Sequence, residues 1–404
     1  MPFFYGYGHG SGPGAIIGPM RCYLSKRAAL KWLETPSVYQ LAKDELHELD
    51  QDSFLFLQNC AGEDGCTCRD GAFFDYCIDE GLLTTEHVRQ HRPPVVPAPT
   101  PSLRYLELQI TNACDLRCRH CYIGDRRTAE LPVPLVRKIL TEFEQMQGLR
   151  VMITGGEPAL HSHFDEINAL LPDFMLRKVL FTNGVSFNKE RLRTLKVDEI
   201  QISIDGLEKA HDSVRGVGTF NRSMQTVRLA LDAGFDVSIA TMVHTGNLGD
   251  FDALDSLFRA LGIKDWTVDV PCSTGRLEKN SALQVSPEIG GKYLGYGYGD
   301  GLHASAPGYG CGLHLMAVMA DGTAAKCSFY GDRGVGNVEE GLAACWSRIV
   351  PIRLNELSCN CEYLEACRGG CRYRAELIDG ARGKDLYRCR LYGILDNKIC
   401  SRQR

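Results

Sequence analysis

The residues of this sequence best able to do chemistry are its 18 cysteines, three of which stand close together. Cys114, Cys118 and Cys121 lie within the run TNACDLRCRHCY, separated by three and then two residues. Three thiolates on one loop can converge on one corner of an iron–sulfur cube, which leaves one iron without a protein ligand. A zinc site of these thiolates and His120 is the alternative, although the position of His120 next to Cys121 is awkward for a fourth tetrahedral ligand.

The elements that must position this loop are short β-branched segments that alternate with amphipathic helical ones. Strand then helix, repeated about every thirty to forty residues, indicates an α/β fold with a parallel sheet. Six such units are too few for an eight-stranded barrel. The cysteine loop follows the first strand, at the edge where α/β sheets bind ligands. The expected strands are 103–110, 150–154, 178–182, 199–204, 236–243 and 264–270, and helical patterns between them include 134–147 and 222–233.

Further polar motifs follow the later strands. Thr154-Gly155-Gly156-Glu157-Pro158 comes after the second strand, Asn183 after the third, and Ser203 and Asp205 after the fourth, before Arg215. Glycines let the backbone approach a ligand closely, and a carboxylate is the natural partner of a cation. Gly-Gly-Glu-Pro alone is equally typical of a plain strand-to-helix turn, and Asp205 could simply cap the following helix.

In this order the motifs resemble those of radical S-adenosylmethionine (SAM) enzymes. The resemblance covers roughly residues 102–275 and implies a partial (β/α)6 barrel. It implies that Cys114, Cys118 and Cys121 carry catalysis by holding a [4Fe–4S] cluster whose open iron binds SAM, and that SAM is reductively cleaved to a 5′-deoxyadenosyl radical. The SAM contacts implied by the resemblance are Gly155, Gly156, Glu157, Pro158, Asn183, Ser203, Asp205, Arg215 and His120, with the Glu157 carboxylate meeting the SAM ammonium group.

The C-terminal part of the chain has a second cysteine pattern, which resembles the SPASM extension of radical SAM enzymes. It consists of Cys311, Gly322-x4-Cys327, Cys359-x-Cys361-x5-Cys367-x3-Cys371 and Cys389. One residue separates Cys359 from Cys361, where the SPASM pattern has two. The resemblance implies a SPASM domain over 311–404, after a connector over 276–310. Zinc knuckles are the alternative.

The SPASM resemblance also implies two auxiliary clusters, and therefore three [4Fe–4S] clusters in all. The first would take Cys311, Cys327 and Cys371, and the second Cys359, Cys361, Cys367 and Cys389. A fourth ligand of the first cluster is open: Cys272 and Cys345 are candidates, and so is an iron left free for substrate.

The N-terminal part divides into a flexible arm over 1–20, a small domain over 21–92 and a Pro-rich linker over 93–101. A hairpin over 39–49 and helices near 53–60 and 73–83 are expected in the domain. It resembles the winged-helix-like peptide-recognition domain (RRE or PqqD-like) that binds a precursor's leader by β-augmentation; a structural cap is the alternative. The domain also contains Cys60, Cys66, Cys68 and Cys77, which could bind zinc or an extra cluster.

Charge and hydropathy exclude several classes of protein. With 45 basic and 50 acidic residues the net charge is −5, so no strong overall field attracts nucleic acid or an anionic membrane. The sequence lacks the roughly 18 consecutive apolar residues of a spanning helix and the basic start of a signal peptide. The expected location is the cytoplasm, with neither nucleic acid nor a membrane as a partner.

The leading functional hypothesis is hydrogen abstraction from a ribosomally made peptide with a leader, giving a thioether or carbon–carbon cross-link or a related modification. A small protein such as ferredoxin or flavodoxin would donate the electron. The alternatives are a radical SAM enzyme of haem or tetrapyrrole biosynthesis, an anaerobic sulfatase-type maturase and, outside the enzymes, a metal-binding regulator. The SAM-binding motifs at Gly155 and Ser203 count against a regulator, which has no use for SAM.

Overall fold

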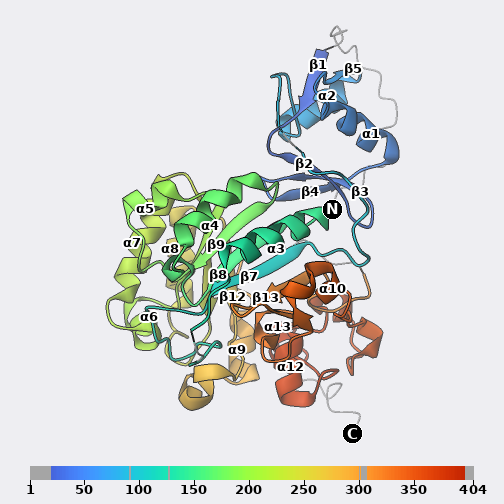
Figure 1. Ribbon diagram of the computed structural model, residues 1–404. Coiled ribbons are helices and arrows are strands. Elements are labelled where there is room, and N and C mark those ends of the chain that lie inside the picture. The colour runs from blue at the N-terminus through green and yellow to red at the C-terminus, as the bar shows by residue number, and fades with distance from the viewer. Residues whose placement is uncertain (1–19, 91, 126–127, 300, 302–306, 396–404) are drawn as a thin grey trace. The chain divides into compact units, whose positions relative to one another are not determined.

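The computed structural model describes residues 20–90, 92–125, 128–299, 301 and 307–395. The chain divides into two compact units (Figure 1). Unit 1 contains the described residues up to Arg104 together with Leu140–Arg150 and Pro172–Arg177. Unit 2 contains the rest of the described chain. No helix in the described ranges is long and apolar enough to cross a membrane.

Unit 2 is built on a sheet whose strand order is β12-β11-β10-β9-β8-β7-β13-β14-β15. All six predicted strands are confirmed, with ends shifted by at most two residues. Strands β9 to β12 pair in parallel, and most of their residues are buried, as expected for a parallel sheet covered on both faces. The six strands are β7 (Tyr105–Thr111), β8 (Arg150–Gly155), β9 (Arg177–Thr182), β10 (Glu199–Ser203), β11 (Asp236–Met242) and β12 (Asp265–Asp269).

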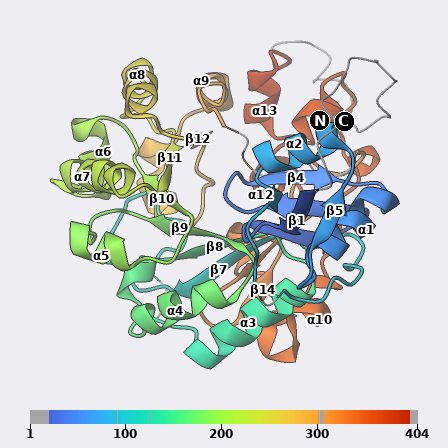
Figure 2. The ribbon, with the colours of Figure 1, turned by 90° about the horizontal axis from the view of Figure 1, so that it is seen from above.

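Helices connect these strands, and Figure 2 shows α4 to α8 along the outer side of the curved sheet. The two helical patterns named from the sequence are confirmed as α3 and α7. The C-cap of α8 is Gly262 in the left-handed region, which favours glycine. The helices are α3 (Val133–Gln145), α4 (Phe164–Leu170), α5 (Lys189–Thr194), α6 (Glu208–Arg215), α7 (Thr219–Asp232) and α8 (Phe251–Leu261).

The sheet does not end at the six predicted strands. Strand β13 (Leu315–Val318) pairs in parallel with β7, so that Leu315 lies opposite Tyr105. Strands β14 (Thr323–Ala325) and β15 (Gly336–Asn337) then add to it in antiparallel fashion. Runs of four, three and two residues are too short to show a hydrophobic period, so the sequence did not predict them. The cysteine-rich part of the chain therefore begins as an extension of the central sheet.

The remaining helices of the chain are short. The α-helices are α9 (Pro287–Tyr293), α10 (Leu342–Trp346), α11 (Leu364–Cys367), α12 (Arg372–Asp379) and α13 (Leu386–Leu391). The 3-10 helices of the described chain are η1 (Pro158–Leu160), η2 (Leu171–Asp173), η3 (Gly275–Leu283), η4 (Ser328–Tyr330), η5 (Val338–Glu340) and η6 (Leu354–Glu356).

Unit 1 holds a small α+β domain, as predicted. Its sheets have the orders β2-β3-β4 and β5-β1-β6. The predicted hairpin is β3–β4, and the predicted helix near 53–60 is α1; the second helix, α2, ends earlier than predicted, before Gly81. The elements are β1 (Met20–Leu24), β2 (Ala28–Trp32), β3 (Pro36–Gln40), β4 (Glu45–Glu48), α1 (Gln51–Cys60), β5 (Cys66–Cys68), α2 (Gly71–Asp79) and β6 (Leu83–Thr84).

The Pro-rich segment runs along this domain. The backbone N–H of Ala98 donates to the carbonyl of Trp32 at 2.8 Å, and the Arg92 guanidinium donates to the carbonyls of Leu24, Ser25 and Ala28. The segment is therefore fastened within unit 1 by backbone contacts. Of the predicted arm over 1–20, residues 1–19 lie outside the described residues.

Candidate active site

A cavity of about 310 Å³ in unit 2 lies at the carboxyl ends of the parallel strands. Residues that follow β7, β8, β9, β10 and β12 all contribute to its lining, because parallel strands end at the same edge of the sheet. Of the twelve residues predicted for the cluster and SAM, those that line this cavity are Cys114, Cys118, Cys121, His120, Gly155, Gly156, Asn183, Ser203 and Arg215.

The glycines of the Gly-Gly-Glu-Pro motif allow the backbone to pack against the cysteine loop. The N–H of Gly156 donates to the Thr111 carbonyl at 2.8 Å, and that of Glu157 donates to the Ala113 carbonyl at 2.7 Å. A Cβ at Gly155 would collide with the Thr111 carbonyl, and one at Gly156 with the Ala113 carbonyl. These glycines therefore fix the start of the loop that carries Cys114.

Glu157 and Pro158 do not belong to the cavity lining. The Glu157 carboxylate is fully buried and accepts hydrogen bonds from the Thr182 hydroxyl at 2.8 and 2.9 Å and from the Asn183 N–H at 2.9 Å. Burial raises the pKa of Glu157 to about 7, against the opposing effect of these hydrogen bonds. The side chain therefore ties the end of β8 to the end of β9 and orients Asn183, which does line the cavity.

Asp205 is the centre of a buried charged group beside the cavity. Its Oδ2 accepts from Arg215 Nε at 2.6 Å and lies 3.1 Å from His120 Nε2, while Oδ1 accepts from the Met242 N–H at 2.8 Å. Burial alone would raise the pKa of Asp205, but Arg215 and His120 hold it well below its usual range. Asp205 does not cap the following helix, because Leu207 is the N-cap residue of α6.

Arg215 and His120 connect this charged group to the cysteine loop. Arg215 Nη1 lies 3.9 Å from Cys118 Sγ. Burial raises the pKa of the Cys118 thiol, and the Arg215 guanidinium opposes that rise. His120 uses Nε2 for Asp205, whereas its buried Nδ1 has no hydrogen-bond partner within the described chain. This unpartnered ring nitrogen beside the cavity is available to hydrogen-bond a bound polar molecule.

Glu107, on β7, is a cavity residue that the sequence analysis missed. Its carboxylate accepts from the Ser328 N–H at 2.8 Å, and burial raises its pKa. The signal was present in the sequence, because Glu107 is the one charged residue of the strand YLELQIT. Cys272 and Phe329 also line this cavity.

The cysteines of the C-terminal segment gather in two places. Cys359, Cys361, Cys367 and Cys389, the four residues predicted for the second auxiliary cluster, line one small cavity together. Cys327 interacts electrostatically with Cys311 and Cys371, the other two predicted ligands of the first auxiliary cluster. Thiols grouped in this way fit iron–sulfur clusters, for which cysteine is the usual ligand.

The two candidates for a fourth ligand of the first cluster have different surroundings. Interaction with the Cys272 side chain lowers the pKa of the Cys371 thiol. Cys345, on α10, instead donates to the Asn337 carbonyl at 3.4 Å. Of the two candidates, Cys272 is therefore the one that interacts with a predicted ligand of this cluster.

Residues 108–258 match the Radical SAM superfamily. The chain thus carries a radical SAM domain, and the class and fold predicted from the cysteine loop and its companion motifs are confirmed. The chain is 30% identical to an AdoMet-dependent heme synthase of Nitratidesulfovibrio vulgaris over 47% of this chain and 54% of that protein. It is 32% identical to the mycofactocin maturase MftC of Mycolicibacterium smegmatis over 39% of this chain and 42% of MftC. The chain spans about half the length of the curated relatives it matches.

Solved structures resemble the chain over a longer stretch. The crystal structure of Streptococcus suis SuiB bound to S-adenosylmethionine superposes with a TM-score of 0.64 and 15% identity, covering 90% of this chain and 98% of SuiB. At this identity the likeness is one of fold. It extends well beyond the radical SAM domain, in keeping with an additional small domain and a cysteine-rich C-terminal segment.

Proposed function

We propose that the protein is a radical SAM enzyme that oxidatively modifies a ribosomally made peptide. The observation that carries this proposal is the composition of one cavity, which is lined both by Cys114, Cys118 and Cys121 and by Cys272 and Ser328. Cys272 and Ser328 adjoin the cysteines of the first auxiliary cluster. A substrate in this cavity would lie between a site of hydrogen abstraction and a site that can accept an electron.

Three cysteines of the loop would hold the SAM-binding cluster, and the residues around them would position SAM. When bound, the [4Fe–4S] cluster and SAM supply a 5′-deoxyadenosyl radical, and the auxiliary clusters supply an electron acceptor. The backbone of Gly155 and Gly156 faces the cavity and would meet the SAM ammonium group, while Glu157 acts from behind by orienting Asn183. Ser203, Arg215 and the Nδ1 atom of His120 would contact the rest of SAM.

We propose three clusters, with Cys272 as the fourth ligand of the first auxiliary cluster beside Cys311, Cys327 and Cys371. Replacing Cys272 by Ala should change the electron paramagnetic resonance signal of that cluster and strongly reduce product formation, because Cys272 interacts with Cys371, one of the other proposed ligands. Cys345→Ala is the matched control, since Cys345 is also buried but bonds to the Asn337 carbonyl. Identical spectra for Cys272→Ala and the unsubstituted protein would remove Cys272 from the ligand set.

The small domain of unit 1 would bind the leader of the peptide along strand β4. The backbone N–H of Leu49 donates to the Pro36 carbonyl, so Pro36 and Leu49 form a hydrogen-bonded pair. Hydrogen-bonded and non-hydrogen-bonded pairs alternate along an antiparallel ladder. In the β3–β4 register, Leu46 and Glu48 belong to the non-hydrogen-bonded pairs, so their backbone N–H and C=O groups point away from β3. Within the described chain β4 pairs with β3 alone. An extended peptide could therefore add to this edge as a further strand. SuiB, which shares the fold, has been solved bound to its precursor peptide SuiA.

The substitution Glu48→Pro tests this edge without disturbing the domain core, because Glu48 is exposed. Proline removes the outward N–H, and it is tolerated on edge strands. We expect leader affinity to fall by about tenfold, the equivalent of one lost main-chain hydrogen bond, with SAM cleavage unchanged. Fluorescence anisotropy with a labelled precursor would measure it. Glu48→Ala, which keeps the N–H, should bind normally; equal binding by the proline variant would exclude β4 as the docking edge.

A tetrapyrrole substrate is the second candidate, and the 30% identity to an AdoMet-dependent heme synthase favours it. The two candidates differ in what the reaction consumes. Reduced protein, incubated anaerobically with SAM and a precursor peptide encoded nearby, should form 5′-deoxyadenosine and a peptide that has lost a pair of hydrogen atoms, detected by mass spectrometry. Turnover of a porphyrin precursor, with no change in any candidate peptide, would favour the second candidate instead.

A further inference from the structure

Unit 1 contains a group of cysteines that the proposed reaction does not use. The sequence singles out Cys60, Cys66, Cys68 and Cys77, and the structure adds Cys22, on β1. Strands β1 and β5 are antiparallel, and Cys22 lies directly opposite Cys66. Directly opposed residues of two strands point to the same face, and Cys66 and Cys68 share a face because side chains alternate along a strand. Three thiols from two strands therefore face the same side of this ribbon.

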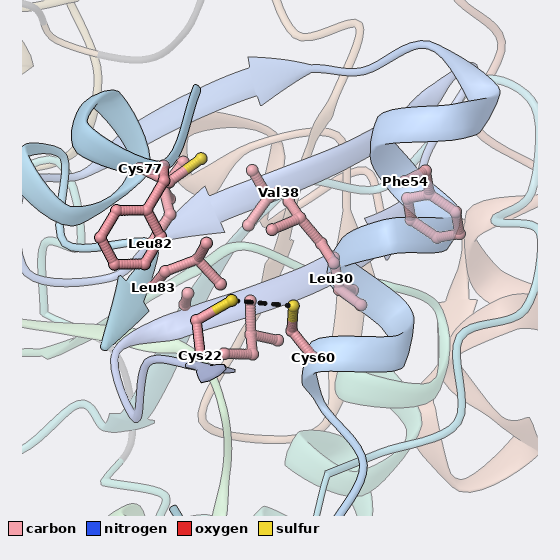
Figure 3. Packing of buried hydrophobic residues seen from close by; sticks show 12 residues of the cluster. Cys22, Leu30, Val38, Phe54, Cys60, Cys77, Leu82 and Leu83 are labelled. Carbon is pink, nitrogen blue, oxygen red and sulfur yellow. Dashed lines mark hydrogen bonds between the residues drawn. The ribbon is translucent and has the colours of Figure 1, made fainter. Parts of the chain in front are cut away.

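Cys60, at the end of α1, meets these thiols on that side. Its Sγ lies 3.8 Å from Cys22 Sγ, and Figure 3 shows the two thiols pointing toward one another. Cys60 also makes a side-chain hydrogen bond with Cys66. The backbone N–H of Cys68 bonds to the Cys22 thiol, and the two thiols interact electrostatically. Cys22 thus contacts all three of the other cysteines, through Cys60 Sγ, the Cys66 carbonyl and Cys68.

The loop between α1 and β5 is shaped to bring these residues together. Gly65 adopts a left-handed conformation with φ of +61°, and a Cβ there would lie 2.6 Å from the Cys22 carbonyl oxygen. Only glycine allows the loop to pass so close to β1. This close approach allows the chain to return from Cys60 to Cys66 within a few residues, as in the short turns that carry two ligands of a metal site.

One pair of thiols, Cys22 and Cys60, has the sulfur–sulfur spacing of two ligands of tetrahedral zinc. Four thiolates at about 2.3 Å from a zinc ion are about 3.8 Å apart from one another, and Cys22 and Cys60 have this separation. A disulfide would need about 2.0 Å between the sulfurs. Cys77 belongs to the same apolar cluster as Cys22 and Cys60 and interacts electrostatically with Cys68 and Cys22. Its sulfur nevertheless lies apart from the Cys22–Cys60 pair in Figure 3, on the side of the cluster that holds Leu82. There it takes the place of a small buried hydrophobic residue.

We propose that Cys22, Cys60, Cys66 and Cys68 bind one zinc ion, separate from the iron–sulfur clusters and from the SAM cavity. The ion would join β1, α1 and β5. Small domains often require such a cross-link, because they bury too little apolar surface to be stable without one. The proposal does not depend on the substrate of the enzyme.

Metal analysis of the full-length protein, expressed with zinc and iron, tests the proposal. We expect about one zinc per chain. Cys22→Ser and Cys60→Ser should each lose most of it with iron content unchanged, and Cys77→Ser, the matched control, should keep it. Zinc retained in a Cys22→Ser/Cys60→Ser double variant, or lost equally in Cys77→Ser, would overturn the assignment.

A second measurement keeps the test valid if the serine variants do not fold. Cobalt exchanged into the unsubstituted protein should show the visible absorption of tetrahedral thiolate coordination, after subtraction of the spectrum of the untreated protein. Alkylation and mass spectrometry under anaerobic conditions should find Cys22 and Cys60 as protected thiols that react once a chelator is added. A Cys22–Cys60 disulfide, iron in place of zinc at this site, or the absence of the cobalt bands would each refute the proposal.

Discussion

Replacing Cys114, Cys118 and Cys121 together by Ala should abolish SAM cleavage and remove about four iron atoms per chain from a total of about twelve. The three thiols are the proposed protein ligands of the SAM-binding cluster, and all three line the cavity. Without them no iron is left to bind SAM. The measurements are iron content after anaerobic reconstitution and 5′-deoxyadenosine formation in the presence of a reductant.

The matched control for this experiment is the double variant Cys359→Ala/Cys361→Ala. Both residues line the separate small cavity with Cys367 and Cys389, so this variant should lose a similar amount of iron. It should nevertheless continue to cleave SAM while failing to complete the product. If the triple variant still produces 5′-deoxyadenosine, the loop is not the SAM-binding centre.

Glu107→Gln should lower product formation by about a hundredfold or more, in the range of a lost general base, and leave SAM cleavage measurable. An oxidative modification that removes two hydrogens from a peptide leaves a proton for the protein to accept. The Glu107 carboxylate lines the cavity and is held by the Ser328 N–H, in a position to take that proton. Measuring product yield and 5′-deoxyadenosine in the same reactions separates an effect on product formation from an effect on SAM cleavage.

The pH dependence gives a further measure of the role of Glu107. Burial raises the pKa of this carboxyl above its usual range, and a base must be ionised to act. Product formation should therefore fall as the pH decreases through this raised pKa, and the Gln variant should lose that acid limb. Glu107→Asp, which keeps a carboxylate, should recover part of the activity. Normal product formation by Glu107→Gln would assign the proton to another group.

Much of the fold was predictable because buried parallel strands produce a recognisable hydrophobic pattern in the sequence. Segments such as Val151–Ile153 and Val179–Leu180 are buried in the sheet and read as short apolar runs. Strands β13 to β15 were not predictable, because their runs are short and β7, the partner of β13 in the central sheet, is distant in the sequence. Parallel pairing of Leu315 with Tyr105 joins residues more than two hundred positions apart, and no local pattern indicates it.

The candidate site was predictable to the extent that its chemistry depends on residue type. The cysteine loop, Asn183 and Ser203 could be named because each follows a strand that the pattern predicts. The sequence could not predict which of the side chains near the site face the cavity. Glu157, just beyond the end of β8, lies behind the cavity wall, whereas Glu107, within β7, lines the cavity. Cys22 was missed for a similar reason, since only the pairing of β1 with β5 brings it to Cys66.

The parallel pairing of β13 with β7 means that the SPASM-like segment is not an appendage that can be cut away. A chain ending near residue 275 would keep every proposed SAM-contacting position but would expose the edge of β7 as a row of unpaired backbone groups. Such an edge favours association with other chains. In unit 2, the part that holds the proposed auxiliary cysteines therefore also covers the edge of β7, and we expect the radical SAM domain expressed without it to associate with other chains.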